Sequence, residues 1–566
     1  MATTFNGSET FQSAFKSALE TLQQQQVAQR VWDRDASLWK KEAAVQETIK
    51  NRLGWLFVAH LMQEKRSKIT DFVDEVRQQG YTTAILLGMG GSSLCPEVLR
   101  STFPTAPGYL KLFVLDSTDV DTIHTLEQKI DLLKTIFIVA SKSGDTLETL
   151  AHYKYFYHKL SRLKGEQAGE HFIVITDPGT PLEILSREQH FRSLFTNPAD
   201  IGGRYSALSF FGVVPGALIG IDTEKLLSRA QEMMWACRAE VVDGENPGLW
   251  LGASLATLYK QGRDKVTFLV SPEIRTFGYW VEQLIAESTG KEGQGLVPVT
   301  GERPGVPAVY GKDRLFVYLR LKDGVNEDLD DTIKSLQDAG QPVISIELND
   351  RYDLGQEFFR WEFATAIIGY FLKINPFDEP NVEESKNNTK RILAQYLNDG
   401  HLTEPHPLAT TANLHIYGKE LGSDPDLTQY LHLFLDQVQA GDYIAIMAYV
   451  EDAAASHAAL QAFRIKLRDK YQVATTLGFG PRFLHSTGQL HKGGPNNGVF
   501  IQITGDLQQD ALIPDESYTF GILKNTQALG DLFALDSHQR RFIRIHILGN
   551  VAQGLQAIEL ALNFMY

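Results

Sequence analysis

The sequence is poor in cysteine, in basic charge and in long apolar runs, and each shortage excludes a class of protein. Cys95 and Cys237 are the only cysteines and stand far apart, so neither a disulfide framework nor a CxxC metal or redox motif can form. The net charge of −15 offers no basic face to a nucleic acid or an anionic membrane. No stretch approaches the roughly 18 apolar residues of a membrane helix, and the N-terminus lacks a signal-peptide pattern. We expect a cytoplasmic protein that binds neither nucleic acid nor membrane.

The composition that remains is that of a large folded protein. At 566 residues the chain exceeds what one hydrophobic core usually serves, and a hydrophobic content of 43% argues against long disordered regions. After a helical pattern over residues 8–80, short apolar runs alternate with helix-length segments, at 84–87, 112–115, 136–140, 172–176, 266–270, 315–319, 343–346, 443–448, 472–475 and 499–503. This alternation predicts an α/β protein with parallel sheets covered by helices. We divide it at residues 1–80, 81–230, 231–400 and 401–566.

Two apolar strands of the first α/β part each run into a turn rich in Gly, Ser and Thr and then into a helix. The first spans residues 84–93 and the second spans residues 136–146. Such turns aim backbone N–H groups and hydroxyls at an anion, and the positive end of the following helix favours negative charge there. The candidate ligand-binding residues are Gly90, Gly91, Ser92, Ser141, Lys142, Ser143 and Thr146. The pair of turns therefore predicts a site for a small phosphorylated ligand.

Each turn has an alternative interpretation. The first resembles a dinucleotide fingerprint, with Asp116 at the end of the next strand, but the third glycine of that pattern falls on Ser93. The hydroxyls of the second turn could instead cap the following helix. We favour phosphate over a nucleotide and expect no cofactor.

Further along the chain, three charged residues stand in settings that suit chemistry. Arg204 follows Gly203 in a Gly-Gly-Arg-Tyr-Ser turn, from which a guanidinium can reach a developing oxyanion. Glu287 ends an apolar helix before a Ser-Thr-Gly-Lys turn, where burial and the negative helix end raise the proton affinity of a carboxylate. Lys386 follows an Asn-Pro-Phe-Asp turn and lies on a helix. Taken singly, they could be a surface salt bridge, an exposed glutamate and a surface lysine.

Two histidines, His485 and His491, flank glycines before the run at residues 499–503. A zinc site would need more ligands nearby, and neither cysteine is close in sequence. Acid–base chemistry or hydroxyl binding is therefore favoured over a metal site.

Together and in this order, these motifs resemble the phosphoglucose isomerase family. The likeness covers roughly residues 85–390 and comprises G-x-G-G-S, S-K-S-G-D-T, G-G-R-Y-S, E-S-T-G-K and N-P-F-D-x-P-x-V-E-x-x-K. Within the family, the sequence is most similar to the isomerase half of bacterial transaldolase/phosphoglucose isomerase fusions. These share the G-F-G-P-R-F-L-H-S-T-G-Q-L-H-K-G-G segment at 478–494. The resemblance implies two sugar-isomerase (SIS) domains at 81–230 and 231–400, preceded by an N-terminal helical region and followed by a C-terminal α/β region.

The resemblance also implies an activity, the interconversion of glucose 6-phosphate and fructose 6-phosphate in glycolysis and gluconeogenesis, without metal or cofactor. Glu287 would move the proton between C2 and C1 while Arg204 stabilises the enediolate, and Lys386 and His485, with His491 as an alternative, would serve ring opening. Alternative functions are a phosphoglucose/phosphomannose isomerase and a non-catalytic sugar-phosphate-binding SIS protein. The implied partners are a second copy of the chain and, functionally, transaldolase.

Two departures from the family pattern bear on these roles. Ordinary bacterial members carry the His-Ser-x-Gly-Gln element soon after E-S-x-G-K, whereas here it follows the lysine motif. Longer, eukaryotic-type members place the base in W-G-E-P-G, and the nearest counterpart is the Gly-Glu-Arg-Pro-Gly turn at 301–305. Glu302 is therefore a rival to Glu287.

Overall fold

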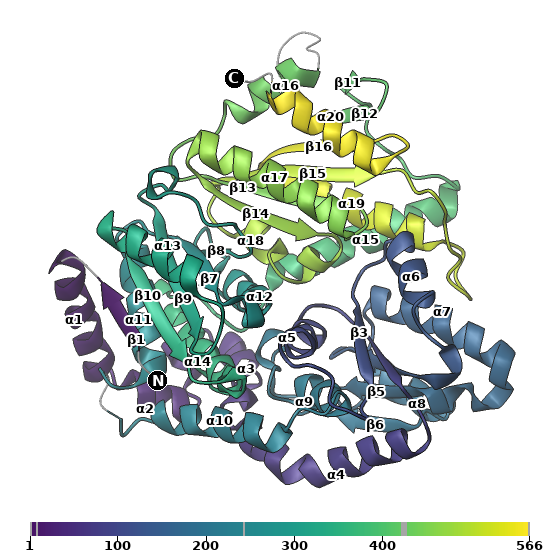
Figure 1. The fold of residues 1–566 in the computed structure, drawn as a ribbon, viewed down its shortest axis with the longest axis horizontal. Coiled ribbons are helices and arrows are strands. Elements are labelled where there is room, and N and C mark those ends of the chain that lie inside the picture. The colour runs from purple at the N-terminus through teal and green to yellow at the C-terminus, as the bar shows by residue number, and fades with distance from the viewer. Residues whose placement is uncertain (1–2, 7–8, 242–243, 420–426, 564–566) are drawn as a thin grey trace.

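The computed structural model describes residues 3–6, 9–241, 244–419 and 427–563. Three β-sheets, each flanked by helices, form three lobes of the molecule (Figure 1). Parallel pairing dominates all three sheets, which confirms the predicted α/β class. Across the described residues, no helix has the length and apolar character needed to cross a membrane.

The first sheet is entirely parallel and has the strand order β3-β2-β4-β5-β6. Its strands are β2 (Thr83–Gly88), β3 (Lys111–Leu115), β4 (Thr135–Ala140), β5 (Phe172–Thr176) and β6 (Ser193–Thr196). All residues of β4 and β5 are buried, as continuous apolar runs between two helical layers require. The connecting helices are α5 (Leu94–Thr102), α6 (Val120–Glu127), α7 (Leu147–Lys164), α8 (Pro181–Glu188) and α9 (Phe210–Leu218).

The second sheet has the order β1-β10-β9-β7-β8. Its strands are β1 (Thr3–Asn6), β7 (Lys265–Val270), β8 (Val297–Val299), β9 (Arg314–Leu321) and β10 (Val343–Leu348), and its helices are α10 (Thr223–Ala236), α11 (Pro247–Lys260), α12 (Phe277–Thr289), α13 (Glu327–Asp338) and α14 (Leu354–Leu372). Strand β1 pairs antiparallel with β10, so the N-terminal region adds an edge strand that the helical pattern does not predict. The N-terminal helices are α1 (Glu9–Gln24), α2 (Val27–Trp32), α3 (Ala43–Lys50) and α4 (Val58–Gln78).

The third sheet lies in the C-terminal region and has the order β11-β12-β16-β15-β13-β14. Its strands are β11 (Ala409–Thr410), β12 (Leu414–Gly418), β13 (Tyr443–Tyr449), β14 (Ala474–Phe479), β15 (Gly498–Gly505) and β16 (Arg541–Ile547), and its helices are α16 (Leu427–Leu435), α17 (Ala454–Tyr471), α18 (Gly488–Gly493), α19 (Phe520–Ser537) and α20 (Val551–Asn563). The predicted strand at 472–475 begins later, at Ala474, because Gln472 adopts φ +54° as the left-handed C-cap of α17. Strand β16 escapes prediction because arginine and histidine interrupt its apolar pattern.

The first sheet offers a binding edge where its strand order reverses. Strand β2 has β3 on one side and β4 on the other, so the turns after β2 and β4 open at the same carboxyl edge, where open α/β sheets bind ligands. Helix α15 (Pro380–Asp399) and α19 pack against each other beside this edge. Leu393 of α15 and Leu523 of α19 enter the hydrophobic cluster on one face of the first sheet. The C-terminal region thus closes over the first sheet.

Candidate active site

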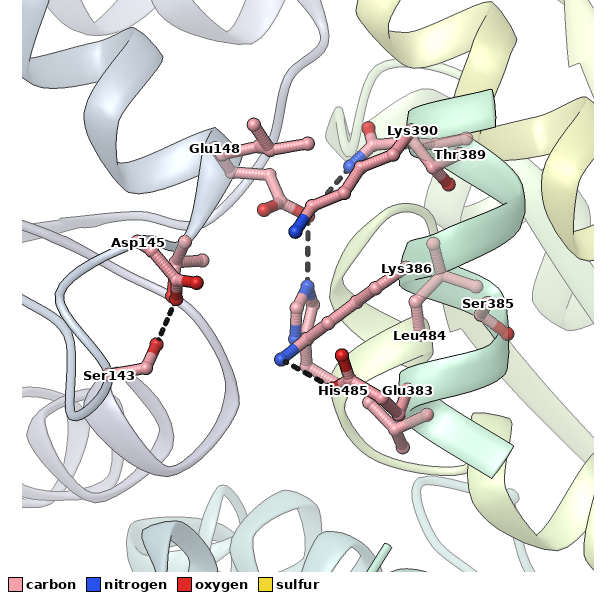
Figure 2. A pocket seen from close by; sticks show the side chains of 14 residues that line it. Ser143, Asp145, Glu148, Glu383, Ser385, Lys386, Thr389, Lys390, Leu484 and His485 are labelled. Atoms are coloured by element: carbon pink, nitrogen blue, oxygen red, sulfur yellow. Dashed lines mark hydrogen bonds and ion pairs between the residues drawn. The ribbon is translucent and has the colours of Figure 1, made fainter. Parts of the chain in front are cut away.

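A cavity of about 150 Å³ lies between the turn that precedes α7, helix α15 and the segment 484–485 (Figure 2). Its lining comprises Ser143, Asp145, Thr146, Leu147, Glu148, Val382, Glu383, Ser385, Lys386, Thr389, Lys390, Leu484, His485 and Gln527. In Figure 2, Lys386 and Lys390 extend from α15 toward the turn that carries Ser143 and Asp145. The cavity therefore combines residues from four separate regions of the sequence, the fourth being Gln527.

The S-K-S-G-D-T turn has the form of an anion cradle. Ser141 Oγ lies 2.9 Å from Thr146 Oγ1 and accepts a hydrogen bond from the N–H of Gly144 at 3.0 Å. Gly144 adopts φ +74°, a conformation that glycine allows without strain. Thr146 is the N-cap residue of α7, yet its hydroxyl does not cap the helix. The capping alternative thus does not account for Thr146.

Lys142 of the same turn is directed elsewhere. Its ammonium pairs with Asp177 and donates to the carbonyl of Ala199 at 3.3 Å. Lys142 is not among the residues that line the cavity. The structure therefore does not bring this predicted ligand-binding residue to the site, because a neighbouring carboxylate holds its charge.

The glycines of the first turn serve close packing. A Cβ on Gly91 would lie 2.0 Å from the carbonyl oxygen of Gly203, and one on Gly90 would lie 2.8 Å from that of His485. Ser92 is buried beside them in the 3₁₀ turn Gly90–Ser92. None of Gly90, Gly91, Ser92 and Gly203 lines the cavity. These residues bring the Arg204 turn and the His485 segment together behind it.

Arg204 is buried and held at several atoms. Its Nε donates to Ser288 Oγ at 2.7 Å, its Nη2 donates to the carbonyl of Pro376 at 2.8 Å, and its Nη1 lies 2.7 Å from Glu379 Oε2 and 3.4 Å from Glu287 Oε2. The alternative interpretation of Arg204 as part of a surface salt bridge is therefore wrong. The guanidinium instead joins the end of α12 to the start of α15.

Glu287 is only 5% exposed and lies in the last turn of α12. Burial raises the pKa of its carboxyl group to about 7, although Arg204 opposes the shift. The alternative of an exposed surface glutamate is therefore wrong. A carboxyl group with this pKa is suited to act as a general base near neutral pH.

The rival Glu302 lies in a cluster of arginines. Its Oε2 is 3.2 Å from Arg314 Nη2 and accepts a hydrogen bond from Thr475 Oγ1 at 3.0 Å, while Arg468 lies 3.8 Å from Oε1. Burial favours a higher pKa, but the attraction of Arg314 and its neighbours outweighs burial, and the pKa of Glu302 is lowered. The surroundings of Glu302 therefore favour its ionised form and suit a general base less well than those of Glu287.

Neither Glu287 nor Arg204 lines the cavity, and His485, which does, connects it to Glu287. Its Nε2 lies 2.9 Å from Glu148 Oε1, and its carbonyl accepts a hydrogen bond of 2.8 Å from Gln283 Nε2, which also lies 3.4 Å from Glu287 Oε2. Burial favours a higher pKa for Glu148, but the attraction of His485 prevails and lowers that pKa to about 2. Glu148 is therefore ionised and orients the imidazole, leaving Nδ1 for a ligand.

The structure separates the two histidines and places Lys386 at the cavity. The His491 ring lies 5.1 Å from that of Phe500, within an aromatic cluster of the third sheet, and does not line the cavity. Burial lowers the pKa of His491 well below its usual value. Lys386 lines the cavity, and its ammonium is 3.8 Å from Glu383. His485, rather than His491, thus shares the site with Lys386.

The remaining motifs have structural partners. Asp116, which favoured the dinucleotide alternative, accepts two hydrogen bonds of 2.8 Å from the guanidinium of Arg482. It therefore anchors the segment that carries His485. Within the described ranges, no group of three His, Cys, Asp or Glu side chains is arranged to hold a metal ion.

Sequence reasoning missed four residues of the site, namely Glu148, Gln283, Glu379 and Gln527. Helical spacing could have found Gln283, because it precedes Glu287 by one turn on the same face of α12. Glu148 follows Thr146 closely in sequence and could have been included with the turn. No local signal points to Gln527, which comes from α19 in the third lobe.

Comparisons with known proteins point to one family. The profile of the family described as phosphoglucose isomerase matches residues 57–300. A probable glucose-6-phosphate isomerase from Methanococcus maripaludis is 26% identical over 390 residues, covering 62% of this chain and 86% of that protein. A glucose-6-phosphate isomerase from Carboxydothermus hydrogenoformans is 28% identical over 402 residues, covering 61% and 86%.

Two solved structures are similar in fold. A hypothetical protein from Thermus thermophilus has a TM-score of 0.56 and 25% identity, covering 69% of this chain and 100% of that one. A glucose-6-phosphate isomerase from Chlamydia trachomatis has a TM-score of 0.52 and 19% identity, covering 66% and 78%. The segment matched by the family profile contains Arg204 and Glu287, whereas Lys386 and His485 lie beyond it.

Proposed function

We propose that this chain, which belongs to the phosphoglucose isomerase family, interconverts glucose 6-phosphate and fructose 6-phosphate through an enediolate. The observation that carries the proposal is the position of Glu287, a buried carboxyl group with a pKa of about 7 beside Arg204 and connected through Gln283 to His485. A base, a cation and a histidine are thus gathered near one phosphate cradle. These are the groups that an aldose–ketose isomerisation requires.

The S-K-S-G-D-T turn would hold the phosphate of the substrate. The hydroxyls of Ser143, which now donates to Asp145, and of Thr146 line the cavity, and that of Ser141 is bonded to Thr146. Turned to the phosphate, these hydroxyls and the first backbone N–H groups of α7 would supply hydrogen-bond donors at the positive end of a helix. Asp145 also lines this end of the cavity, and Lys386 and Lys390 extend toward it from α15. The two ammonium groups would balance the charge of Asp145. Phosphate binding would then orient the reacting carbons.

Glu287 would carry the proton between C2 and C1. Abstraction of the C2 proton of the open-chain aldose leaves negative charge on the enediolate oxygens. The hydroxyl proton then passes from O2 to O1, and the same carboxyl group returns its proton to C1, which leaves the ketone at C2. Arg204 lies next to Glu287 and would stabilise that charge. Its bonds to Ser288 and Pro376 hold the guanidinium in place before the substrate arrives.

Ring opening would be the task of His485 and Lys386, since both line the cavity. One group must protonate the ring oxygen while the other accepts the proton of the C1 hydroxyl. Glu148 fixes the imidazole through Nε2, which leaves Nδ1 as the atom that meets the sugar. In Figure 2 the Lys386 side chain extends from α15 to the part of the cavity where the His485 ring lies.

The wider biological setting follows from this proposal. We place the reaction in glycolysis and gluconeogenesis, in the cytoplasm, and treat a homo-oligomer and a functional link to transaldolase as hypotheses. The two cysteines are buried and unpaired, in keeping with a reducing compartment.

The test is isomerisation by the purified protein in deuterium oxide. We expect fructose 6-phosphate to form from glucose 6-phosphate, with deuterium entering at C2 of the recovered aldose, and we expect EDTA to leave the rate unchanged. Mannose 6-phosphate and ribulose 5-phosphate, assayed side by side, define the substrate range. Tight binding of glucose 6-phosphate without conversion or exchange would instead indicate a sugar-phosphate-binding protein.

A further inference from the structure

Helix α19 reaches from the third lobe onto the first sheet and is fixed there by buried contacts. Lys524 Nζ lies 2.9 Å from Asp119 Oδ2, and both side chains are buried. The ring of Phe520 stacks on that of His152 on α7, with centroids 5.6 Å apart. The first turns of α19 are thereby held against the start of α6, through Asp119, and against α7, the helix that carries Glu148.

Gln527 occupies the middle of α19 and has a hydrogen-bond partner at each end of its amide. Its Nε2 donates to Glu148 Oε1 at 2.6 Å, and its Oε1 accepts a hydrogen bond of 3.0 Å from Thr118 Oγ1. Gln527 is 2% exposed and also lines the cavity. Because Thr118 can donate only its hydroxyl hydrogen while a carboxylate only accepts, this arrangement sets which end of the amide faces Glu148.

We propose that Gln527 is a positioning residue for His485, acting through the Glu148 carboxylate that both side chains contact. The inference rests on the proposed function and assigns the C-terminal region a part in ring opening. Thr118, Gln527, Glu148 and His485 form one line of hydrogen bonds from the first sheet to the cavity. Because Gln527 also holds the Glu148 carboxylate, that carboxylate cannot move with the His485 ring if the ring rotates.

The same contact bears on the bond between Glu148 and the imidazole. Gln527 and His485 bind the same oxygen, Oε1 of Glu148. A second donor on that oxygen takes part of its negative charge and weakens its hold on a protonated imidazole. Loss of the Gln527 amide should therefore strengthen the attraction between Glu148 and a charged His485. His485 would then keep its proton to a higher pH.

Other ionisable groups lie in and beside the cavity around His485. They are Asp145 and Glu148 at the start of α7, Glu383, Lys386 and Lys390 on α15, and Glu287 on α12. None of them except Glu148 has a hydrogen bond to Gln527 within the described part of the chain. A change in the titration of His485 in a Gln527 variant can thus be assigned to Glu148.

The experiment compares the titration of His485 in the parent and in Gln527→Leu. Ring carbons of labelled histidine report the titration by NMR, and His485→Asn identifies the signal among the 15 histidines. We expect the titration midpoint to rise by about one pH unit, the equivalent of one hydrogen bond to a charged group. The limb of the kcat/KM profile that reports His485 should move in the same direction, with kcat reduced.

Gln502→Leu is the matched control. Gln502 is a buried glutamine of β15. Its amide donates at 3.0 Å to the carbonyl of Ala528 on α19, the helix that also carries Gln527. It does not contact Glu148, so its loss should leave the titration unchanged. Thr118→Val keeps the Gln527 amide but removes its orienting partner and should give a smaller shift of the same sign. If Gln527→Leu fails to fold, Thr118→Val decides the question.

The outcomes separate the inference from the proposed function. A raised midpoint in Gln527→Leu, absent from Gln502→Leu, supports the positioning role even if the parent protein does not isomerise glucose 6-phosphate. Equal midpoints and equal pH profiles in parent and Gln527→Leu would overturn it even if isomerisation is observed. A fall in thermal stability with no change in titration would reduce Gln527 to a docking residue.

Discussion

Glu287 and Glu302 are equally buried, each 5% exposed, and each lies beside an arginine, yet the structure moves their pKa values in opposite directions. Around Glu287, Arg204 is shared with the closer carboxylate of Glu379. Around Glu302, Arg314 is in direct contact and Arg468 adds a second positive charge. The same residue type at the same depth is therefore a candidate base in one place and a permanent anion in the other.

The comparison shows that burial alone does not decide what a carboxyl group does. Desolvation raises the pKa in both positions, and the balance of cations to anions nearby decides the net result. Near Glu287 one guanidinium serves two carboxylates, whereas near Glu302 two guanidinium groups serve one. Of these two residues, Glu287 is therefore the candidate for proton exchange near neutral pH.

The largest effect is expected from Glu287→Gln. The amide keeps the shape of the side chain but cannot accept the C2 proton, so kcat should fall by about 10²–10⁴ or more. Deuterium exchange at C2 should vanish together with turnover, while binding of glucose 6-phosphate, measured by calorimetry, should persist. Glu302→Gln should retain exchange, and the reverse pattern would assign the base to Glu302.

The second effect concerns stability and should be confined to Glu302. Glu302→Gln leaves Arg314 and Arg468 buried without their common partner, and breaking such a cluster costs about 3–5 kcal/mol. Thermal unfolding should show a lower Tm for Glu302→Gln. Glu287→Gln should be at least as stable as the parent at pH 8, because it removes a carboxyl group whose ionisation the fold resists. Equal destabilisation of both variants would contradict the contrast.

Substitution of the phosphate cradle should weaken binding rather than abolish proton transfer. Thr146→Val removes one hydroxyl, and a hydrogen bond to a charged group is worth about 1.5–3 kcal/mol. The loss should appear mainly in KM if the phosphate contact is equal in ground and transition states. Lys142→Met is the control in the same turn, since Lys142 pairs with Asp177 and should affect KM little. If Lys142→Met raised KM more than Thr146→Val does, Lys142 would have to be counted among the phosphate-binding residues.

The smallest effect is the pH dependence of the parent enzyme. Because the pKa of Glu287 is raised to about 7, the fraction of ionised base falls as the pH drops through neutrality. The kcat/KM value should therefore decrease about tenfold for each pH unit below about 7. If kcat/KM instead began to fall only near pH 4, Glu287 would titrate as an ordinary exposed carboxyl group.

Much of the fold could be predicted from the chain because its signals are local. The strand β5 (Phe172–Thr176) coincides with its predicted apolar run, and the turns after β2 and β4 stand where glycine and hydroxyl residues were noted. Strand β16 could not be predicted, since its buried Arg544 interrupts an apolar pattern and is tolerated only through partners such as Thr504. Lys142 and His491 have motif positions like those of site residues, but their neighbours direct them elsewhere.

The sequence by itself determined the α/β class, the phosphate-type turn, and the set of acids, bases and cations from which the site is drawn. Only the tertiary structure decided that the pKa is raised at Glu287 and lowered at Glu302, that His485 rather than His491 lines the cavity, and that Gln527 contacts Glu148. The physical reason is that backbone conformation depends on nearby residues, whereas proton affinity depends on desolvation and on charges that the fold brings from distant segments.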